Sequence, residues 1–233
     1  MGSRRGSGVS RYIVIEGLIG VGKTSLCRLL ERERGAKLVL EPVEDNPFLA
    51  AFYADAERFA FPTQMFYLAT RYAQQMDLHQ PELFTRLIVS DYLYAKDRLF
   101  AELTLSETEL ALYDRFARLL SGSVAIPDFV LFLDAPTRVI QQRIQRRAIA
   151  SEQGISPDYL DALRDRYYAL WDRYDKSPVY VLDTTGIDYI SDRAGQEWMM
   201  DLIQSYLDGR PKPGAPGPYR SVAKIQVPLF PRR

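Results

Sequence analysis

The residues best suited to chemistry lie in a glycine-rich stretch near the start of the chain. Residues 17–24 match the pattern in which Gly17 and Gly22 flank a four-residue spacer before Lys23 and Thr24. The glycines let backbone N–H groups turn toward phosphate oxygens, Lys23 would bridge the β- and γ-phosphates of a nucleotide, and Thr24 would bind Mg²⁺. A glycine-rich turn without a ligand is the simpler alternative, but the flanking strand and helix patterns favour phosphate binding. The predicted loop comprises Gly17, Leu18, Ile19, Gly20, Val21, Gly22, Lys23, Thr24 and Ser25.

A second candidate group consists of arginines in residues 143–147. Arg143 and Arg147 are four positions apart, so they share one face of the predicted helix. On a mobile lid, two guanidinium groups would neutralise the charge that develops on a transferring phosphate. The alternative is a solvated basic helix face, and the phosphate-binding loop favours the lid.

These distant residues need a scaffold, and five apolar runs predict one. Near-continuous apolar runs are typical of strands buried on both faces, and helical stretches separate them. This alternation indicates an α/β fold with a five-stranded parallel sheet, in which ligands bind at the carboxyl ends of the strands. The predicted strands are 11–16, 36–41, 87–90, 129–133 and 179–182.

Composition favours one globular domain of ordinary charge. The 233 residues suffice for a single core, and 30 basic and 30 acidic side chains cancel, so no net field attracts nucleic acid or a membrane. The single cysteine, Cys27, fits a reducing compartment, and no apolar run is long enough to span a bilayer. We therefore expect a cytoplasmic protein with a flexible arm at 1–10, an α/β domain at 11–207 and a Pro/Gly-rich tail at 208–233.

Three classes of nucleotide-binding protein compete for this pattern. A GTPase switch needs a base-reading Asn-Lys-x-Asp segment, which the chain lacks. Asp134 follows an apolar strand, as in many motor or DNA-directed ATPases, but Ala135 stands where many of these carry a second carboxylate. A small-molecule kinase needs an acceptor pocket and an arginine-bearing lid, and the sequence favours this class.

Beyond the loop, an ordered set of short motifs resembles the deoxynucleoside kinase family, most closely its bacterial deoxyadenosine and deoxyguanosine kinases. The loop alone is common to many families, whereas the ordered set with its spacings is specific. The resemblance spans residues 12–189 and rests on 15–24, 41–43, 46–49, Phe52, Tyr53, Gln64, Arg71, 90–92, Glu152 and 159–160.

The resemblance implies a homodimeric enzyme that uses ATP and Mg²⁺ to phosphorylate the 5′-hydroxyl of a deoxynucleoside, with purines favoured. Glu41 is then the base at the 5′-hydroxyl, and its simpler alternative is a helix-capping acid. Gln64 reads the nucleobase edge and Arg71 supports the pocket, and a spacing of seven puts both on one helical face. A surface glutamine is the alternative for Gln64. The other implied contacts are Tyr53 and Glu152 to the 3′-hydroxyl, and Ile187, Asp188 and Tyr189 against the donor adenine.

Two places depart from the family pattern. Asp91 ends the third strand without the arginine that often follows, so Lys96 or Arg98 is expected to supply that charge, while Asp91 holds Mg²⁺ or acts as an auxiliary base. A lysine offers a point charge rather than a bidentate fork, so the replacement is not neutral. The lid has Ile149 where the family often has another arginine.

Two other functions stay open. A nucleoside monophosphate kinase resembling thymidylate kinase would need extra arginines around its acceptor, and Arg71 alone allows it. A regulatory ATP-binding protein would bind nucleotide without acceptor-dependent ADP release. Several residues are expected to serve structure or to stack on a base without a defined role: His79, Cys27, Trp171, Trp198, Phe61, Phe66 and Phe84.

Overall fold

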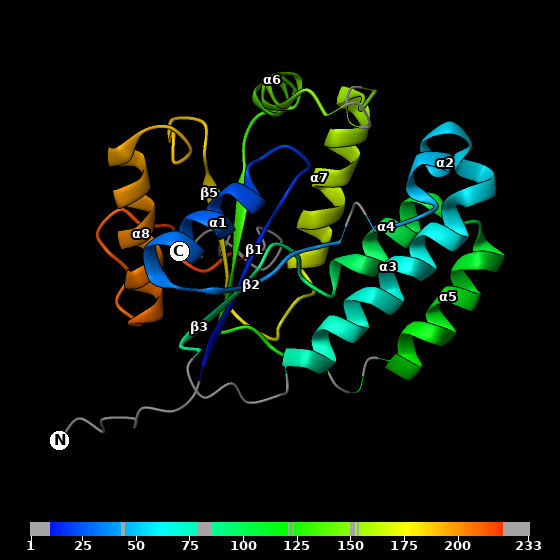
Figure 1. Ribbon diagram of the computed structural model, residues 1–233, viewed down its shortest axis with the longest axis horizontal. Coiled ribbons are helices and arrows are strands. Elements are labelled where there is room, and N and C mark those ends of the chain that lie inside the picture. The colour runs from blue at the N-terminus through cyan, green and yellow to red at the C-terminus, as the bar shows by residue number, and fades with distance from the viewer. Residues whose placement is uncertain are drawn as a thin grey trace, which may run out of the picture.

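The computed structural model describes residues 10–42, 45–78, 85–120, 122, 124–149, 152 and 154–220. Its centre is a parallel sheet in the order β2-β3-β1-β4-β5 (Figure 1). The predicted α/β fold with five parallel strands is therefore confirmed. The strands are β1 Arg11–Gly17, β2 Lys37–Val39, β3 Leu87–Ser90, β4 Phe129–Asp134 and β5 Val179–Asp183.

One strand is shorter than its apolar run suggests. The run 36–41 predicts six residues, whereas β2 covers only Lys37–Val39. Within the described sheet, β2 is an edge strand that pairs with β3, and that pairing stops at Val39 opposite Ser90. The next residues leave the sheet, which places Glu41 beyond the strand end rather than within it.

Helices cover both faces of the sheet. Alternate strand residues such as Ile13 and Ile15 face α1 and α8, whereas Val14 and Phe132 face α4, α6 and α7. Figure 1 shows α1 and α8 on one side and α3, α4, α5 and α7 on the other. The helices are α1 Lys23–Arg34, α2 Leu49–Ala54, α3 Ala56–Leu78, α4 Lys96–Thr104, α5 Glu107–Leu120, α6 Thr137–Arg147, α7 Pro157–Trp171 and α8 Arg193–Leu207.

Residues with an expected structural role lie in these two layers. Cys27 and Trp171 are buried in the core, and Trp198 packs against it from α8. His79 and Phe84 lie outside the described residues. No described helix combines the length and apolarity that a bilayer crossing requires.

The segment after α8 runs back along the domain. Its residues 208–220 contain no helix or strand beyond an isolated antiparallel bridge between Pro218 and Tyr180 of β5. The Tyr219 N–H donates to the Val179 carbonyl at 2.6 Å, and the Lys212 ammonium lies 4.7 Å from the Trp198 ring centroid. The proline-rich segment is thus irregular, as its composition predicts, yet it contacts the sheet edge. Residues 1–9 and 221–233 lie outside the described part of the chain.

Candidate active site

The glycine-rich loop joins β1 to α1 at the carboxyl end of the central strand. Gly17, Gly20 and Gly22 have φ values of 151°, 79° and 111°, a region that side-chain-bearing residues rarely adopt. A Cβ on Gly22 would also overlap the hydroxyl of Tyr189. The loop therefore needs glycine for its backbone conformation and, at Gly22, for the close approach of a neighbouring ring.

Lys23 begins α1 and folds back over this loop. Its Nζ donates to the Gly17 carbonyl at 2.9 Å and the Leu18 carbonyl at 3.1 Å. Burial and the nearby Lys96 ammonium lower the pKa of Lys23, while the carboxylates of Glu16 and other neighbours oppose that shift. An anionic ligand in the loop would compensate this crowded positive charge.

Asp91 joins the phosphate-binding loop to the end of β2. One of its carboxylate oxygens accepts from the Thr24 hydroxyl at 2.7 Å, and the other accepts from the Glu41 N–H at 2.8 Å. Thr24 and Asp91 thus place a hydroxyl and a carboxylate side by side next to the phosphate-binding loop. Mg²⁺ is commonly bound by one or two such oxygen ligands from the protein, together with waters and phosphate oxygens. The described residues contain no cluster of three or more His, Cys, Asp or Glu that would hold a metal without such a partner.

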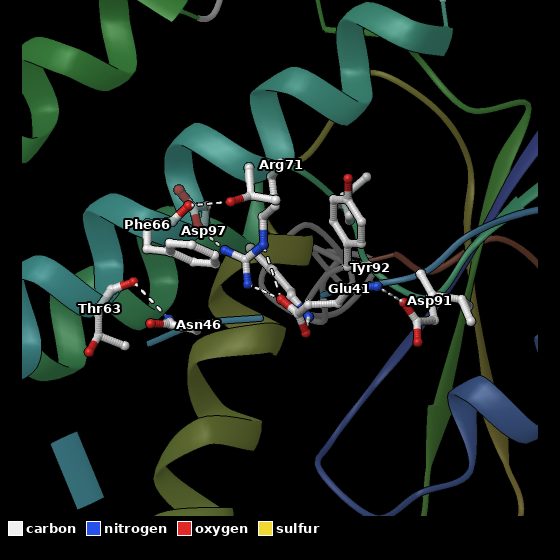
Figure 2. Close-up of polar contacts among 12 residues, drawn as sticks. Glu41, Asn46, Thr63, Phe66, Arg71, Asp91, Tyr92 and Asp97 are labelled. Atoms are coloured by element: carbon white, nitrogen blue, oxygen red, sulfur yellow. Dashed lines mark hydrogen bonds and ion pairs between the residues drawn. The ribbon is translucent and has the colours of Figure 1, made fainter. Parts of the chain in front are cut away.

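Glu41 is held between two buried cations. Its Oε1 accepts from Arg71 Nε at 3.0 Å and its Oε2 from Lys96 Nζ at 3.1 Å. Figure 2 shows the Arg71 guanidinium directed at the Glu41 carboxylate, with Asp91 on the far side. Burial alone would raise the pKa of Glu41, but Arg71 and Lys96 outweigh it and hold that pKa well below its ordinary 4.5. Glu41 is therefore a fixed carboxylate anion, and it does not cap a helix.

Arg71 also contacts an acid that the sequence analysis did not single out. Its guanidinium forms a second ion pair, with Asp97 in the first turn of α4, and both side chains are almost fully buried. The guanidinium lies 4.9 Å from the Tyr67 ring centroid and 5.7 Å from that of Tyr92. The Arg71 guanidinium is thus shared by two buried carboxylates, those of Glu41 and Asp97.

The open choice between Lys96 and Arg98 is resolved by geometry. Lys96 is buried at 3% exposure and contacts Glu41, whereas Arg98 points outward to Asp114 and Glu102. Lys96 is therefore the cation beside Glu41. Lys96 also lies 3.7 Å from Glu16.

Glu16 is a second acid that the sequence analysis left without a role. It is fully buried in β1 and accepts from the N–H groups of Gly17 at 2.8 Å and Leu93 at 2.9 Å. The Tyr167 hydroxyl of α7 donates to it at 2.9 Å. A charged residue inside an otherwise apolar strand was the visible signal, because such a residue needs buried partners.

Gln64 lies on the buried face of α3 that also carries Arg71. It is 4% exposed, so the surface alternative is wrong. Its Nε2 donates to the Thr104 hydroxyl at 3.1 Å, and among the described residues its Oε1 has no hydrogen-bond partner. Of the aromatic candidates, Phe66 and Phe61 are partly buried on the same helix.

The two predicted sugar ligands differ in their surroundings. Glu152 forms an ion pair with Arg147 at the end of α6. Burial raises the pKa of the Tyr53 phenol, and the Glu152 carboxylate adds to that shift. Tyr53 itself is 48% exposed. The charge of Glu152 is thus engaged by Arg147 of α6.

Arg143 points from α6 toward the glycine-rich loop and Thr184. Its Nη1 donates to the Thr184 hydroxyl at 2.8 Å and the Val21 carbonyl at 3.2 Å, and its Nη2 donates to the Thr184 carbonyl at 2.8 Å. The Tyr189 hydroxyl donates to the same Val21 carbonyl at 2.9 Å. Arg143 and Tyr189 are therefore both fastened to the tip of the phosphate-binding loop.

The other residues of the predicted adenine loop behave differently. Ile187 packs against the core beside α8. Asp188 is turned to its own loop, where it accepts from the N–H groups of Ile190 at 3.0 Å and Ser191 at 2.8 Å.

The Asp134 carboxylate, at the end of β4, is held by side chains of α7 and by the next backbone N–H. Its carboxylate accepts from Arg164 Nε at 3.1 Å, the Tyr168 hydroxyl at 2.9 Å and the Ala135 N–H at 2.8 Å. These contacts tie the end of β4 to α7, and within the described part of the chain they engage both carboxylate oxygens of Asp134. The geometry therefore disfavours the motor or DNA-directed ATPase class.

Comparison with known proteins gives one family for nearly the whole domain. The family described as "Deoxynucleoside kinase" matches residues 13–208. A deoxyguanosine kinase of Bacillus subtilis (strain 168) is 35% identical over 157 residues, which cover 67% of this chain and 76% of that protein. A deoxyadenosine/deoxycytidine kinase of the same organism is 28% identical over 207 residues, covering 86% and 94%.

Solved structures agree in fold. The deoxyadenosine kinase of M. mycoides with products dCMP and a flexible dCDP bound is 25% identical, with a TM-score of 0.68, covering 85% of this chain and 98% of that one. The same enzyme with bound dATP gives a TM-score of 0.72 at 23% identity, covering 84% and 99%.

Proposed function

Because the chain belongs to the deoxynucleoside kinase family, and is therefore a phosphotransferase with an alcohol acceptor, we propose that it transfers the γ-phosphoryl group of ATP to the 5′-hydroxyl of a purine deoxynucleoside. ATP use follows from the family. The purine preference is supported by the relatives named for deoxyguanosine and deoxyadenosine, although other relatives are named for deoxycytidine, alone or together with deoxyadenosine. The single observation that carries the proposal is the Glu41 carboxylate, fixed between Arg71 and Lys96 and joined through Asp91 to the phosphate-binding loop.

Glu41 accepts the proton of the 5′-hydroxyl in this mechanism. Its lowered pKa keeps it ionised at neutral pH, so it accepts a hydrogen bond from the hydroxyl and orients it for in-line attack. Phosphoryl transfer passes through a loose transition state, so the hydroxyl becomes acidic only as its bond to phosphorus forms. A weakly basic carboxylate is then sufficient, because the proton moves late.

Positive charge surrounds the transferring group on the donor side. Lys23, Arg143 and Arg147 neutralise the phosphate oxygens, and Lys96 holds charge at the acceptor side. Release of Arg143 from Thr184 and of Arg147 from Glu152 would let both reach the phosphates. Thr24 and Asp91 would hold Mg²⁺, which neutralises β- and γ-phosphate charge when bound.

The acceptor pocket lies between α3 and the strand ends. Gln64 faces the base edge and Arg71 stabilises the wall of the pocket, while Tyr53 and Glu152 bind the 3′-hydroxyl. The backbone of residues 17–25 and the loop Ile187, Asp188 and Tyr189 receive the donor nucleotide. Arg71 is engaged by Glu41 and Asp97, which speaks against its use for the phosphate of a monophosphate acceptor.

We also propose a homodimer in the cytoplasm, with 11–207 as the kinase domain. Leu112, Phe116 and Leu119 on α5 are exposed apolar residues spaced along one helix face, which supports burial against a second copy. The single cysteine, a buried thiol, supports a reducing compartment.

The test is ADP release from Mg·ATP in the presence of each deoxynucleoside, ribonucleoside and nucleoside monophosphate in turn. Stimulation by deoxyadenosine or deoxyguanosine supports the proposal and names the substrate. Stimulation by deoxycytidine or thymidine alone would contradict the purine preference. Stimulation by monophosphates alone would replace the proposal with a monophosphate kinase, and no stimulation would leave an ATP-binding protein.

A further inference from the structure

The hydrogen bonds around Gln64 give its carboxamide a defined polarity. Gln64 Nε2 donates to Thr104 Oγ1 at 3.1 Å, and the Thr104 hydroxyl donates to the Phe100 carbonyl one turn earlier in α4 at 2.8 Å. A threonine hydroxyl has a single proton, and here that proton is already engaged. Thr104 Oγ1 can therefore only accept from Gln64.

A rotated carboxamide would meet an unfavourable neighbour. With the amide reversed, Gln64 Oε1 would face Thr104 Oγ1, so two acceptors would oppose each other unless Thr104 gave up its bond to Phe100. The observed orientation leaves Oε1 buried and, within the described part of the chain, without a donor. Buried acceptors in proteins are normally satisfied, so this oxygen is the place for a donor from a ligand.

We propose that Thr104 is a specificity-determining residue, because it fixes which end of the Gln64 carboxamide meets each position of the base edge. This inference rests on the proposed function, in which Gln64 reads the base. Adenine presents an amino donor at C6 and an acceptor at N1, whereas a 6-oxo purine presents an acceptor at C6 and a donor at N1. A carboxamide of fixed polarity satisfies one order and opposes the other. A carboxamide free to rotate satisfies both.

The experiment compares substrates that differ only in this order. Deoxyadenosine and deoxyinosine share the sugar and ring system and reverse the donor and acceptor at C6 and N1. We expect wild-type enzyme to favour one of them by at least about fivefold in kcat/KM, because a bidentate carboxamide contact discriminates on this scale. Thr104→Val keeps the shape, removes the acceptor, and should reduce the ratio by about threefold or more, toward one.

Two variants serve as matched controls. Thr104→Ser keeps the hydroxyl and should retain the wild-type ratio within about twofold. Thr70→Val removes an equivalent hydrogen bond, from Thr70 to the Phe66 carbonyl at 2.8 Å in α3, and should leave the ratio within the same limit.

Each result distinguishes this inference from the proposed function. A wild-type ratio near one, or the same ratio in Thr104→Val as in wild type, would overturn the role of Thr104 while leaving the kinase intact. An equal change in Thr70→Val would assign the effect to helix packing and also overturn it. Failure of wild-type enzyme to phosphorylate either nucleoside would overturn the purine assignment, and the inference with it.

Discussion

The acceptor side and the lid side of the site use the same residue types in opposite ways. At the acceptor side, the Arg71 side chain is 3% exposed and lies between Glu41 and Asp97, with Lys96 beside them. At α6, the Arg147 side chain is 43% exposed, and among the described residues its ion pair is with Glu152. Buried charges of this kind hold a fixed geometry, whereas exposed ion pairs exchange partners at little cost. The surroundings of Arg71 are thus preorganised, whereas Arg147 can exchange Glu152 for another partner at little cost.

The largest expected effect comes from breaking the chemistry of the preorganised acceptor side. Glu41→Gln keeps the size of the side chain but removes the anion that we propose orients the 5′-hydroxyl. We expect kcat to fall by about 10²–10⁴-fold, the usual contribution of a positioned base, with little change in ATP affinity. Steady-state kinetics and ATP titration measure both quantities. Glu197→Gln, at an exposed pair with Arg193, is the control and should keep full activity. Equal kcat in Glu41→Gln and wild type would refute the role of Glu41.

The next effect is on stability. Arg71→Met leaves the carboxylates of Glu41 and Asp97 without their shared guanidinium in a buried place, so we expect the free energy of unfolding to fall by about 3–5 kcal/mol. Arg98→Met removes the same type of side chain from exposed pairs with Asp114 and Glu102 and should cost less than about 1 kcal/mol. Urea denaturation followed by circular dichroism measures both. Similar losses in the two variants would contradict the contrast between buried and exposed arginines.

For Arg147 we expect a small effect on stability and a large effect on kcat. Arg147→Met removes an exposed ion pair, so the free energy of unfolding should change by less than about 1 kcal/mol. Its effect on kcat should be about 10²-fold, because one charged donor to the transferring phosphate is lost. The two measurements on one variant sharpen the comparison with Arg71. A stability loss as large as that of Arg71→Met, or an unchanged kcat, would contradict it.

The smallest effect is a dependence on pH. The folded-state pKa of Glu41 lies below its ordinary 4.5, so its contribution to stability is fully present above about pH 4.5 and is lost as the pH falls toward the folded value. The difference in unfolding free energy between wild type and Glu41→Gln should therefore shrink on acidification, by at most about 1.4 kcal/mol per pH unit. Urea denaturation of both proteins from about pH 7 to about pH 3 measures this difference. A difference that grows with acidity would show that the sign of the pKa shift is wrong.

Short sequence patterns predicted those features of the fold that depend on neighbouring residues in the chain. The spacing of Gly17, Gly22, Lys23 and Thr24 indicated the loop between β1 and α1, and the apolar runs indicated the parallel sheet. The choice between Lys96 and Arg98 could not be made from the sequence. Two residues that are two positions apart on a helix lie on nearly opposite sides, and the side that faces Glu41 depends on how α4 leaves β3.

Sequence patterns could not predict ion-pair and hydrogen-bond partners that lie on elements distant in the chain. The Arg71–Asp97 pair depends on the packing of α3 against α4, and the contact between Gln64 and Thr104 depends on the same packing. Glu16 depends on β1, α7 and the turn before α4 meeting at one point. Spacing along one helix can predict a shared face, but it cannot name the residue on the facing helix.

The proline-rich segment after α8 affects whether the sheet edge at β5 can pair with another molecule in solution. β5 is an outer strand of the sheet, and such strands offer unpaired backbone groups to other chains. Tyr219 occupies the Val179 carbonyl, and Pro218, opposite Tyr180, has no N–H to offer to a further strand. The segment thereby covers part of the β5 edge, which disfavours the addition of a strand from another molecule and the aggregation that would follow. A purification tag or fusion partner should therefore be joined beyond Tyr219, so that Pro218 and Tyr219 remain against β5.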